Sequence, residues 1–178
     1  HQYLSILFHA GLSIIPRFPG EEMLAPFKRV VESGLADGLI VGQTRNQDVR
    51  LRYLLEKDFP FVSFGRSELF SPHPYFDVAH EEITYHSTIQ FLEAGHRRIA
   101  LVSPPADLNY TSHRRKGFNK AMNEWGVRPE PELVVDIELS FESGREIMGT
   151  FLGMKNPPQA FLSPGVSVTL GMLAALKQ

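Results

Sequence analysis

The chain has 178 residues, of which 43% are hydrophobic and 21% are charged, and its formal net charge is -2. This composition is typical of a globular protein long enough for one large or two small cores, and the near-neutral charge argues against strong nucleic-acid binding by this chain alone. It contains no cysteine, which excludes disulfides and cysteine-based zinc sites, and no apolar run approaches the roughly 20 residues of a membrane span.

Residues 2–12 are rich in apolar side chains and favour a buried helix, although the pattern also permits a strand. A strand is expected over 14–18, immediately after Ser13. A helix and a strand are normally joined by a few residues, so we hypothesise that residues are missing between Ser13 and Ile14. The chain opens on His1 rather than Met, and we expect it to begin inside a longer protein.

The next segments alternate between helix and strand. Apolar spacing predicts a helix that ends near Gly34, with Pro26 tolerated in its first turn. Residues 37–41 are expected to form a turn that enters a strand, and a further strand is expected over 59–64. The spacing of Val49, Tyr53 and Leu54 predicts a helix between them. An irregular stretch over 65–74 leads to a short edge strand over 75–78.

A helix is then expected to end at Ala94, with Gly95 in the left-handed position beyond it. Its inward residues are expected to be Thr84, Thr88, Phe91 and Leu92. Ile99 to Val102 reads as a buried parallel strand. The following helix is expected to bury one face made of Phe118, Ala121, Met122 and Trp125.

The remaining chain predicts strands over 133–136 and 160–163, with a helix through Ile147 and Phe151 between them. The final helix, up to Lys177, is apolar on most sides. It is therefore expected to be buried, either under elements beyond Gln178 or in a subunit interface. Alternating strands and helices imply an α/β fold with parallel sheets and right-handed crossovers. The expected division is into two Rossmann-like subdomains, 1–95 and 96–178.

The most informative candidate residue is Arg114. The buried face of its helix, extended back one turn, passes through Gly117 to Arg114. A cation would thus lie near a helix N-terminus and just past the carboxyl end of a strand, where open α/β sheets bind ligands. The macrodipole does not favour a cation there, which points to a ligand contact. The alternative is that Arg114 is a surface residue, with its aliphatic carbons packed along the protein and its guanidinium in water.

The sequence carries few signals for other catalytic, metal-binding or ligand-binding sites. Dinucleotide, phosphate-loop, zincin and hydrolase signatures are absent. The acidic pairs Glu21–Glu22 and Glu81–Glu82 are better explained as helix starts than as catalytic carboxylates. The seven histidines lack metal-ligand spacing, so no metal is expected. Six aromatic residues could wall a ring-shaped ligand: Phe59, Phe61, Phe64, Phe70, Tyr75 and Phe76. The strand members among them are expected in the core, whereas the loop members Phe70 and Tyr75 are the better ligand candidates.

Several runs together resemble the lactose-repressor/galactose-repressor (LacI/GalR) family of bacterial transcription regulators. They are Leu35–Val41, Phe59–Arg66, Leu92–Val102, Arg114–Phe118, Pro158–Leu162 and Leu170–Lys177. The resemblance covers nearly the whole chain in the right order. The pairing of Ala-Gly-His-Arg-Arg-Ile-Ala-Leu-Val with Arg-x-x-Gly-Phe is its most specific part.

The resemblance implies an effector-binding core that is similar to periplasmic sugar-binding proteins, incomplete in this chain, and preceded by a DNA-binding head that the chain does not contain. The family arginine that contacts ligand hydroxyls falls on Arg114, and Asp77 and Arg66 fall near other positions of the ligand cleft. We add Tyr110, Phe70 and Tyr75 as effector-binding candidates. The chain departs from the family where Gly165-Val166 replaces Asn-Asp and Ala79-His80 replaces Asp-Asn.

These expectations describe a cytoplasmic, homodimeric DNA-binding regulator of LacI type, repressor-like, with a sugar-like effector, no cofactor, no membrane contact and no catalytic activity. Two alternatives remain open. One is a solute-binding protein of a sugar transport system, which a secretory signal upstream would favour over a helix-turn-helix. The other is an α/β enzyme acting on sugars or phosphates, which turnover of a bound ligand would reveal.

Overall fold

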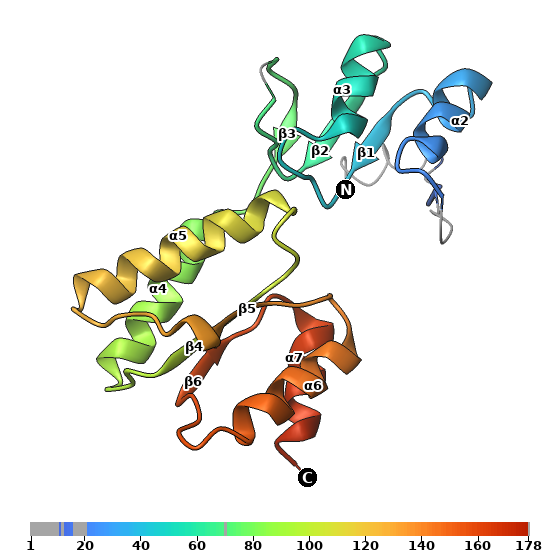
Figure 1. The fold of residues 1–178 in the computed structure, drawn as a ribbon. Helices are drawn as coiled ribbons and strands as arrows, with labels where there is room; N and C mark the ends of the chain where they lie inside the picture. Colours follow the sequence, from blue (N-terminus) through green and yellow to red (C-terminus); the bar gives the residue numbers. More distant parts are fainter. Residues whose placement is uncertain (1–10, 12, 16–20, 70, 178) are drawn as a thin grey trace, which may run out of the picture. The chain divides into compact units, whose positions relative to one another are not determined.

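The computed structural model describes residues 11, 13–15, 21–69 and 71–177 and alternates helices with strands, as the sequence predicts (Figure 1). The first half of the chain contains, in order, α2 (Ala25–Ser33), β1 (Leu39–Val41), α3 (Val49–Glu56), β2 (Phe61–Phe64), β3 (Tyr75–Phe76) and α4 (His80–Glu93). The second part contains β4 (Ile99–Ser103), α5 (Asn109–Glu124), the 3-10 helix η1 (Pro131–Leu133), β5 (Val134–Asp136), α6 (Phe141–Leu152), β6 (Ala160–Leu162) and α7 (Val166–Ala175).

The expectations for residues 2–18 fall largely outside the described residues. Of that stretch, residues 11 and 13–15 are described, and they belong to no helix or strand. The hypothesis of missing residues between Ser13 and Ile14 therefore stays a prediction.

The strands form two sheets, with the orders β1-β2-β3 and β5-β4-β6. Strand β2 pairs in parallel with β3, and β4 pairs in parallel with both β5 and β6. The α/β class with parallel sheets is thereby confirmed. Strand β4 is central in its sheet, and all five of its residues are buried, as expected for a strand covered on both faces.

The two faces of the β5-β4-β6 sheet carry separate hydrophobic clusters. On one face Leu101 packs with Leu92 of α4 and Phe118 of α5. On the other face Val102 packs with residues of α6 and α7, among them Met148 and Met172. The alternation of Leu101 and Val102 follows from the pleat of the strand, so helices α5 and α7 cover opposite faces.

By backbone proximity the chain forms two compact units, one of His1–Leu39 with Val49–Phe61 and the other of Ile40–Asp48 with Val62–Gln178. Helix α4, which precedes the expected boundary at residue 95, shares a hydrophobic cluster with β4 and α5, which follow it. The division into subdomains 1–95 and 96–178 remains a prediction.

Local capping signals in the sequence are confirmed. Pro26 lies in the first turn of α2, and Gly34 ends that helix with a left-handed backbone (φ 65°). Gly95 likewise has φ 90°, and its N–H donates to the Leu92 carbonyl. Both glycines occupy the position where other residues would be strained.

Two expectations about helix faces need correction. Trp125 was predicted on the buried face of α5, but it follows the helix, is 40% exposed, and has the Arg97 guanidinium 5.4 Å from its ring. Helix α7 is buried on one side only, through Val168, Gly171 and Met172. Its other large apolar side chains are 46–76% exposed: Val166, Leu170 and Leu173. The two partners considered for this side, a further segment or a second subunit, remain predictions.

Among the described residues, none of the helices combines the length and the apolar character that crossing a membrane requires.

Candidate functional site

The carboxyl ends of β4 and β6 form a topological switch point. The two strands are adjacent and parallel, yet the helix after β4 and the helix after β6 cover opposite faces of the sheet. The loop after β4 and the loop after β6 must therefore turn toward opposite faces of the sheet. Open α/β sheets bind ligands outside the carboxyl ends of strands at such a point. We call this place the β4–β6 switch point.

Arg114 of α5 reaches the β4–β6 switch point from the buried side of its helix. Its side chain is only 8% exposed, and its Nη2 donates to the Val102 and Ser163 carbonyls, each at 3.2 Å. Val102 and Ser163 come directly after Leu101 and Leu162, the last residues that pair β4 with β6, so one guanidinium bridges the two strands where their pairing ends. The predicted burial of Arg114 is confirmed, and the surface alternative is wrong.

The position of Arg114 within α5 differs from the expectation. The helix begins at Asn109, so Arg114 lies in the second turn rather than at the N-terminus. Its Nε is buried without a hydrogen-bond partner among the described residues. Burial lowers the pKa of Arg114, and the nearby Tyr110 only partly opposes this. An arginine stays protonated all the same, so the site holds a desolvated positive charge.

Two further polar side chains near the β4–β6 switch point have unsatisfied atoms. Ser103, which ends β4, is fully buried, and its Oγ has no partner among the described residues. By strand alternation it lies on the same face as Leu101, the face that α5 covers. Asn109 is 2% exposed, and its Oδ1 is also unpartnered. Buried polar atoms are normally hydrogen-bonded, so these two oxygen atoms are candidates for contact with a ligand.

Asn109 also ties the start of α5 to the segment after β2. Its Nδ2 donates to the Arg66 carbonyl at 2.7 Å, and its backbone N–H donates to the Thr44 carbonyl at 2.9 Å. The Thr44 hydroxyl donates to the same Arg66 carbonyl at 3.0 Å. These bonds hold the backbone carbonyl of Arg66 and do not involve its guanidinium.

Arg66 and Asp77, two predicted site residues, form an ion pair. Arg66 Nε lies 2.6 Å from Asp77 Oδ2, and the guanidinium lies 6.0 Å from the centre of the Tyr75 ring. The hydrogen bond that Arg66 donates to Asp77 raises the pKa of Arg66. Burial alone would raise the pKa of Asp77, but hydrogen bonds from Arg66 and Val78 outweigh it and lower that pKa. The structure thus brings Arg66, Tyr75 and Asp77 together.

Tyr110, another predicted residue, stacks on His80 with ring centres 4.9 Å apart. Burial raises the pKa of Tyr110, which the charge of Arg114 partly offsets. Burial lowers the pKa of His80, and Arg114 and Arg66 lower it further against the opposing effect of Asp77. His80 is therefore within electrostatic range of Arg114, Arg66 and Asp77. Phe70, the remaining candidate, lies outside the described residues.

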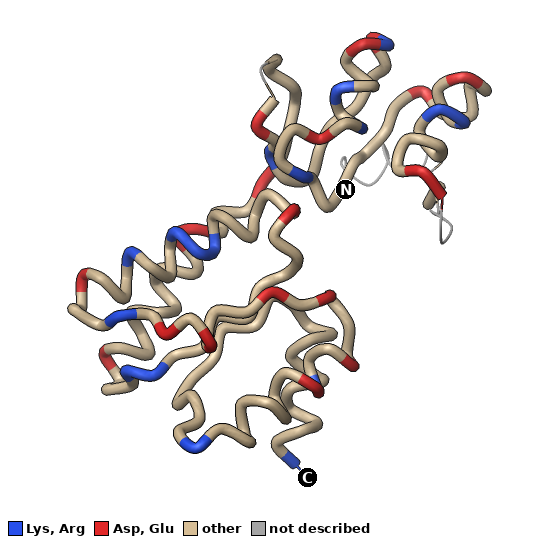
Figure 2. The backbone as a smooth tube through the Cα atoms, in the orientation of Figure 1, with Lys and Arg blue, Asp and Glu red and all other residues tan. Residues whose placement is uncertain are grey.

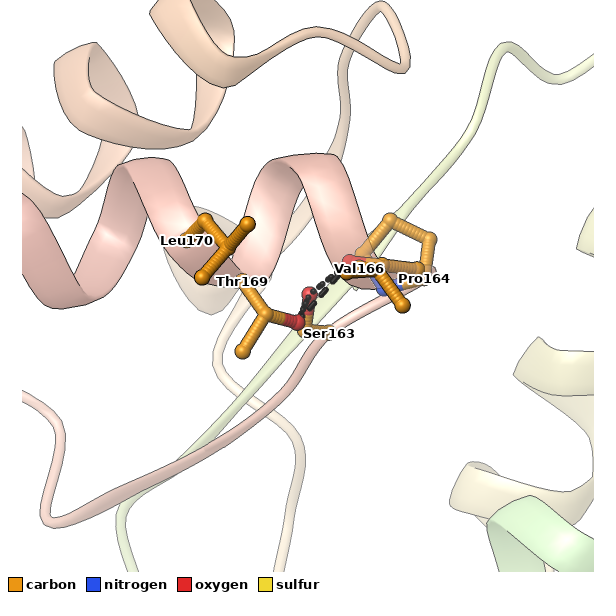
Figure 3. Close-up of a pocket in the computed structure, with 6 residues that line it drawn as sticks. Ser163, Pro164, Val166, Thr169 and Leu170 are labelled. Carbon is orange, nitrogen blue, oxygen red and sulfur yellow. Dashed lines mark hydrogen bonds between the residues drawn. The ribbon is translucent and has the colours of Figure 1, made fainter.

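A shallow pocket of about 350 Å³ adjoins the β4–β6 switch point, within the range of volumes that small-molecule sites occupy. Figure 3 shows its lining, which comes from the end of β6 and the start of α7: Ser163, Pro164, Gly165, Val166, Thr169 and Leu170. We call it the β6–α7 pocket. Inside it the Thr169 hydroxyl lies 2.8 Å from both Ser163 Oγ and the Gly165 carbonyl oxygen. The Ser163 carbonyl is the one that Arg114 contacts, so pocket and guanidinium share a residue.

Sequence reasoning missed Ser103, Asn109 and His80. The position of Ser103 at the end of a buried strand was a usable signal, because switch points lie at strand ends. Asn109 could have been found as the polar residue that opens α5. His80 was grouped with the other histidines as a residue without metal-ligand spacing. Its stacking on Tyr110 joins α4 to α5, and the sequence around either residue carries no signal of such a contact.

In the part of the chain that the structure describes, no three His, Cys, Asp or Glu side chains gather in a way that could hold a metal ion. Basic and acidic residues are interspersed along the described chain, without a long basic stretch (Figure 2). The site therefore offers hydrogen bonds, one desolvated cation and aromatic faces, which suit the binding of a small polar molecule.

Comparison with known proteins gives consistent findings. A family model described as "Periplasmic binding protein-like domain" matches residues 88–178. The HTH-type transcriptional regulator AglR of Rhizobium meliloti is 33% identical over 173 residues, which cover 96% of this chain and 48% of that protein. The HTH-type transcriptional regulator RafR of Escherichia coli is 28% identical over 137 residues, covering 77% of this chain and 40% of that one.

Among solved structures, a regulatory protein of LacI family from Chloroflexus aggregans has a TM-score of 0.76 at 26% identity, over 91% of this chain and 58% of that one. The present chain spans about half the length, or less, of the two curated relatives named above.

Proposed function

Because the chain belongs to the periplasmic binding protein-like domain family, we propose that it is the effector-binding core of a DNA-binding transcription regulator of LacI type. The observation that carries the proposal is the burial of Arg114 at the β4–β6 switch point, together with unsatisfied buried polar atoms of Ser103, which ends β4, and Asn109, which begins α5. A structural arginine would have its donors satisfied, whereas a ligand-binding arginine keeps some of them for the ligand.

In this proposal the effector is a small, sugar-like molecule that accepts charge-assisted hydrogen bonds from Arg114. Tyr110 and Tyr75 offer aromatic faces, of which Tyr75 is 53% exposed. The Arg66–Asp77 pair offers both donors and acceptors near His80. Phe70 stays in the candidate set from the sequence.

The proposed mechanism is a population shift. Effector binding favours one arrangement of the two subdomains, and a homodimer then presents its two DNA heads differently to a two-fold operator. A coupling of about 1–3 kcal/mol gives a change of about 5–150-fold in operator affinity. The DNA head lies outside this chain. Such a regulator acts in the cytoplasm, without a cofactor or catalysis, and the exposed side of α7 is the surface that we assign to the dimer.

Regulation is favoured over solute transport because the curated relatives named above are HTH-type transcriptional regulators. Enzymatic turnover is not favoured, since nothing in the geometry of the described residues combines a nucleophile, a base and a metal ligand set.

The test is a thermal-shift screen of sugars and nucleosides on the purified protein. A ligand at 100 times its dissociation constant adds about 2.7 kcal/mol to stability. The Arg114→Ala variant should fold and lose this shift, whereas Arg128→Ala, which removes a cation just after α5, should keep it. An Arg114→Ala variant with undiminished ligand affinity would refute the assignment of the site.

A further inference from the structure

The loop over 43–48, which follows β1, docks on the start of α5. We infer that this loop is a latch: its polar contacts with residues 107–109 are made and broken together, and they hold the segments after β1 and β2 against α5 in one of two arrangements. We call the loop and these contacts the 43–48 latch. The inference rests on the proposed function and deepens it, because it names the contacts through which the population shift takes place.

The latch meets the start of α5 through neighbouring residues on each side. Arg45 pairs with Leu108 in an isolated antiparallel bridge, and its Nε lies 2.5 Å from Asp107 Oδ2. The Asn109 N–H donates to the Thr44 carbonyl at 2.9 Å. Because the residues on each side are consecutive, the loss of one of these contacts weakens the others.

The loop itself is held by a separate set of hydrogen bonds. The carboxylate of Asp48, a residue that is 1% exposed, accepts from the Arg45 N–H at 3.0 Å. The Ser67 hydroxyl accepts from the Asp48 N–H at 3.1 Å and donates to the Arg45 carbonyl at 2.7 Å. These bonds join the loop to the segment after β2 and do not involve α5. The loop can therefore leave α5 without losing its own structure.

The backbone of the latch is strained. Gln43 and Gln47 have left-handed backbone, with φ of 50° and 48°. Asp58 is the one other non-glycine residue of the described chain with a positive φ. Such a conformation costs free energy in a residue that has a Cβ, persists only where the surroundings enforce it, and is concentrated at switch regions. Two strained residues in one short loop thus point to a segment that changes conformation.

The contacts of the latch with α5 suit a reversible tie. The side chains of Arg45 and Asp107 are 29% and 54% exposed, and exposed ion pairs contribute little to stability. Asn109 is 2% exposed and donates through Nδ2 to the Arg66 carbonyl, which also accepts from the Thr44 hydroxyl. Opening therefore frees the side chain of Asn109 at the candidate site, while the Arg66 carbonyl keeps one of its two donors.

The backbone amide of Asn109 reports directly on the latch. It lies in the first turn of α5, where N–H groups have no partner within the helix, so the Thr44 carbonyl is the acceptor that protects it. Hydrogen exchange of this amide, followed by NMR on the purified protein without any ligand, measures how often the latch opens. The amide of Phe118, in the interior of α5, reports opening of the helix itself.

The test reverses the charge of the ion pair. Arg45→Asp replaces attraction with repulsion and should speed exchange of the Asn109 amide about fivefold or more, since loss of an exposed pair alone accounts for up to about fivefold and repulsion adds to it. The double variant Arg45→Asp with Asp107→Arg restores opposite charges and should return the exchange rate towards that of the unmodified protein. Exchange of the Phe118 amide should be the same in all three proteins.

Arg29→Asp is the matched control, because it makes the same charge change and breaks another exposed ion pair, that of Arg29 with Glu21. This variant should leave exchange of the Asn109 amide unchanged. None of the substituted side chains is buried, so each variant is expected to fold.

Three outcomes would overturn the inference. They are an Asn109 amide equally protected in Arg45→Asp, no recovery in the double variant, and equally faster exchange of the Phe118 amide, which would mean that the helix opens rather than the latch. Because no ligand takes part, each of these outcomes leaves the proposed function to be decided by the thermal-shift screen and by Arg114→Ala.

Discussion

The same substitution at two glycines, one in α7 and one in α6, is predicted to have opposite effects on stability. Gly171 lies in the middle of α7, and a Cβ built there would be 1.9 Å from the Phe141 carbonyl oxygen and 2.8 Å from the Arg145 nitrogen, both in α6. Gly149 lies in the middle of α6, and a Cβ there would meet nothing within 4 Å. Gly171→Ala should therefore destabilise the protein, and Gly149→Ala should stabilise it.

The magnitudes follow from two opposing effects. Alanine is favoured over glycine in a helix interior by about 1 kcal/mol, which is the whole expected gain at Gly149. At Gly171 the new methyl group meets helix backbone, which cannot rotate away as a side chain can. Overpacking costs typically about 1–3 kcal/mol and occasionally more. We place Gly171→Ala at the upper end of this range, so that the net loss is about 2 kcal/mol after the gain in propensity.

Urea unfolding of the unmodified protein and both variants measures these differences. Melting temperatures give a second readout, at about 2–4 °C per kcal/mol for a domain of 150–250 residues. Equal stabilities of Gly171→Ala and Gly149→Ala would refute the argument, because they would mean that α6 and α7 do not approach as closely as described.

Three further changes test the core, a helix cap and a titrating group. Phe118→Ala truncates a fully buried side chain and should lower the free energy of unfolding in urea by about 3–5 kcal/mol. Trp125→Ala truncates a side chain that is 40% exposed and should lower it by about 1 kcal/mol or less. Equal losses in the two variants would contradict the described packing. Ser140→Ala removes the acceptor for the Ser143 N–H and should destabilise α6 by about 1 kcal/mol, and a neutral effect would mean that the cap does not form in solution. The pKa of His80 lies below its ordinary value of 6.5 in the folded protein, so the unfolded chain binds more protons and stability should fall as the pH drops from about 6.5 towards the lowered pKa. His80→Gln should flatten this part of the pH profile, and an unchanged slope would assign it to other groups.

Much of the fold was predictable because its signals are local. The apolar run of β4, the helical spacing of Phe118 and Met122, and the glycine that ends α4 each depend on neighbours within a few residues. The burial of Arg114 was predictable for the same reason, since it lies one turn from Gly117 on the packed face of α5.

The rest of the site could not be read from local patterns. Asn109 contacts the Arg66 carbonyl across 43 residues, and Arg114 contacts Ser163 across 49. Such contacts depend on strand order, and the sequence does not encode strand order in any single segment. The start of α5 was also misplaced, because Asn109 and Tyr110 lack the apolar spacing that marks the rest of the helix.

The central place of β4 has a consequence for the order in which the molecule can assemble. This strand precedes both of its neighbours in the chain, and its hydrogen-bonding edges are filled only by 134–136 on one side and 160–162 on the other. While the polypeptide is being synthesised, the pair α4 and α5 can dock as a local hairpin, but strand β4 between them, whose five residues are all buried in the final fold, keeps an open edge until residue 162 has left the ribosome. Unpaired edges of this kind invite aggregation, so the interval between the synthesis of β4 and that of β6 is the period in which this protein most depends on protection by chaperones.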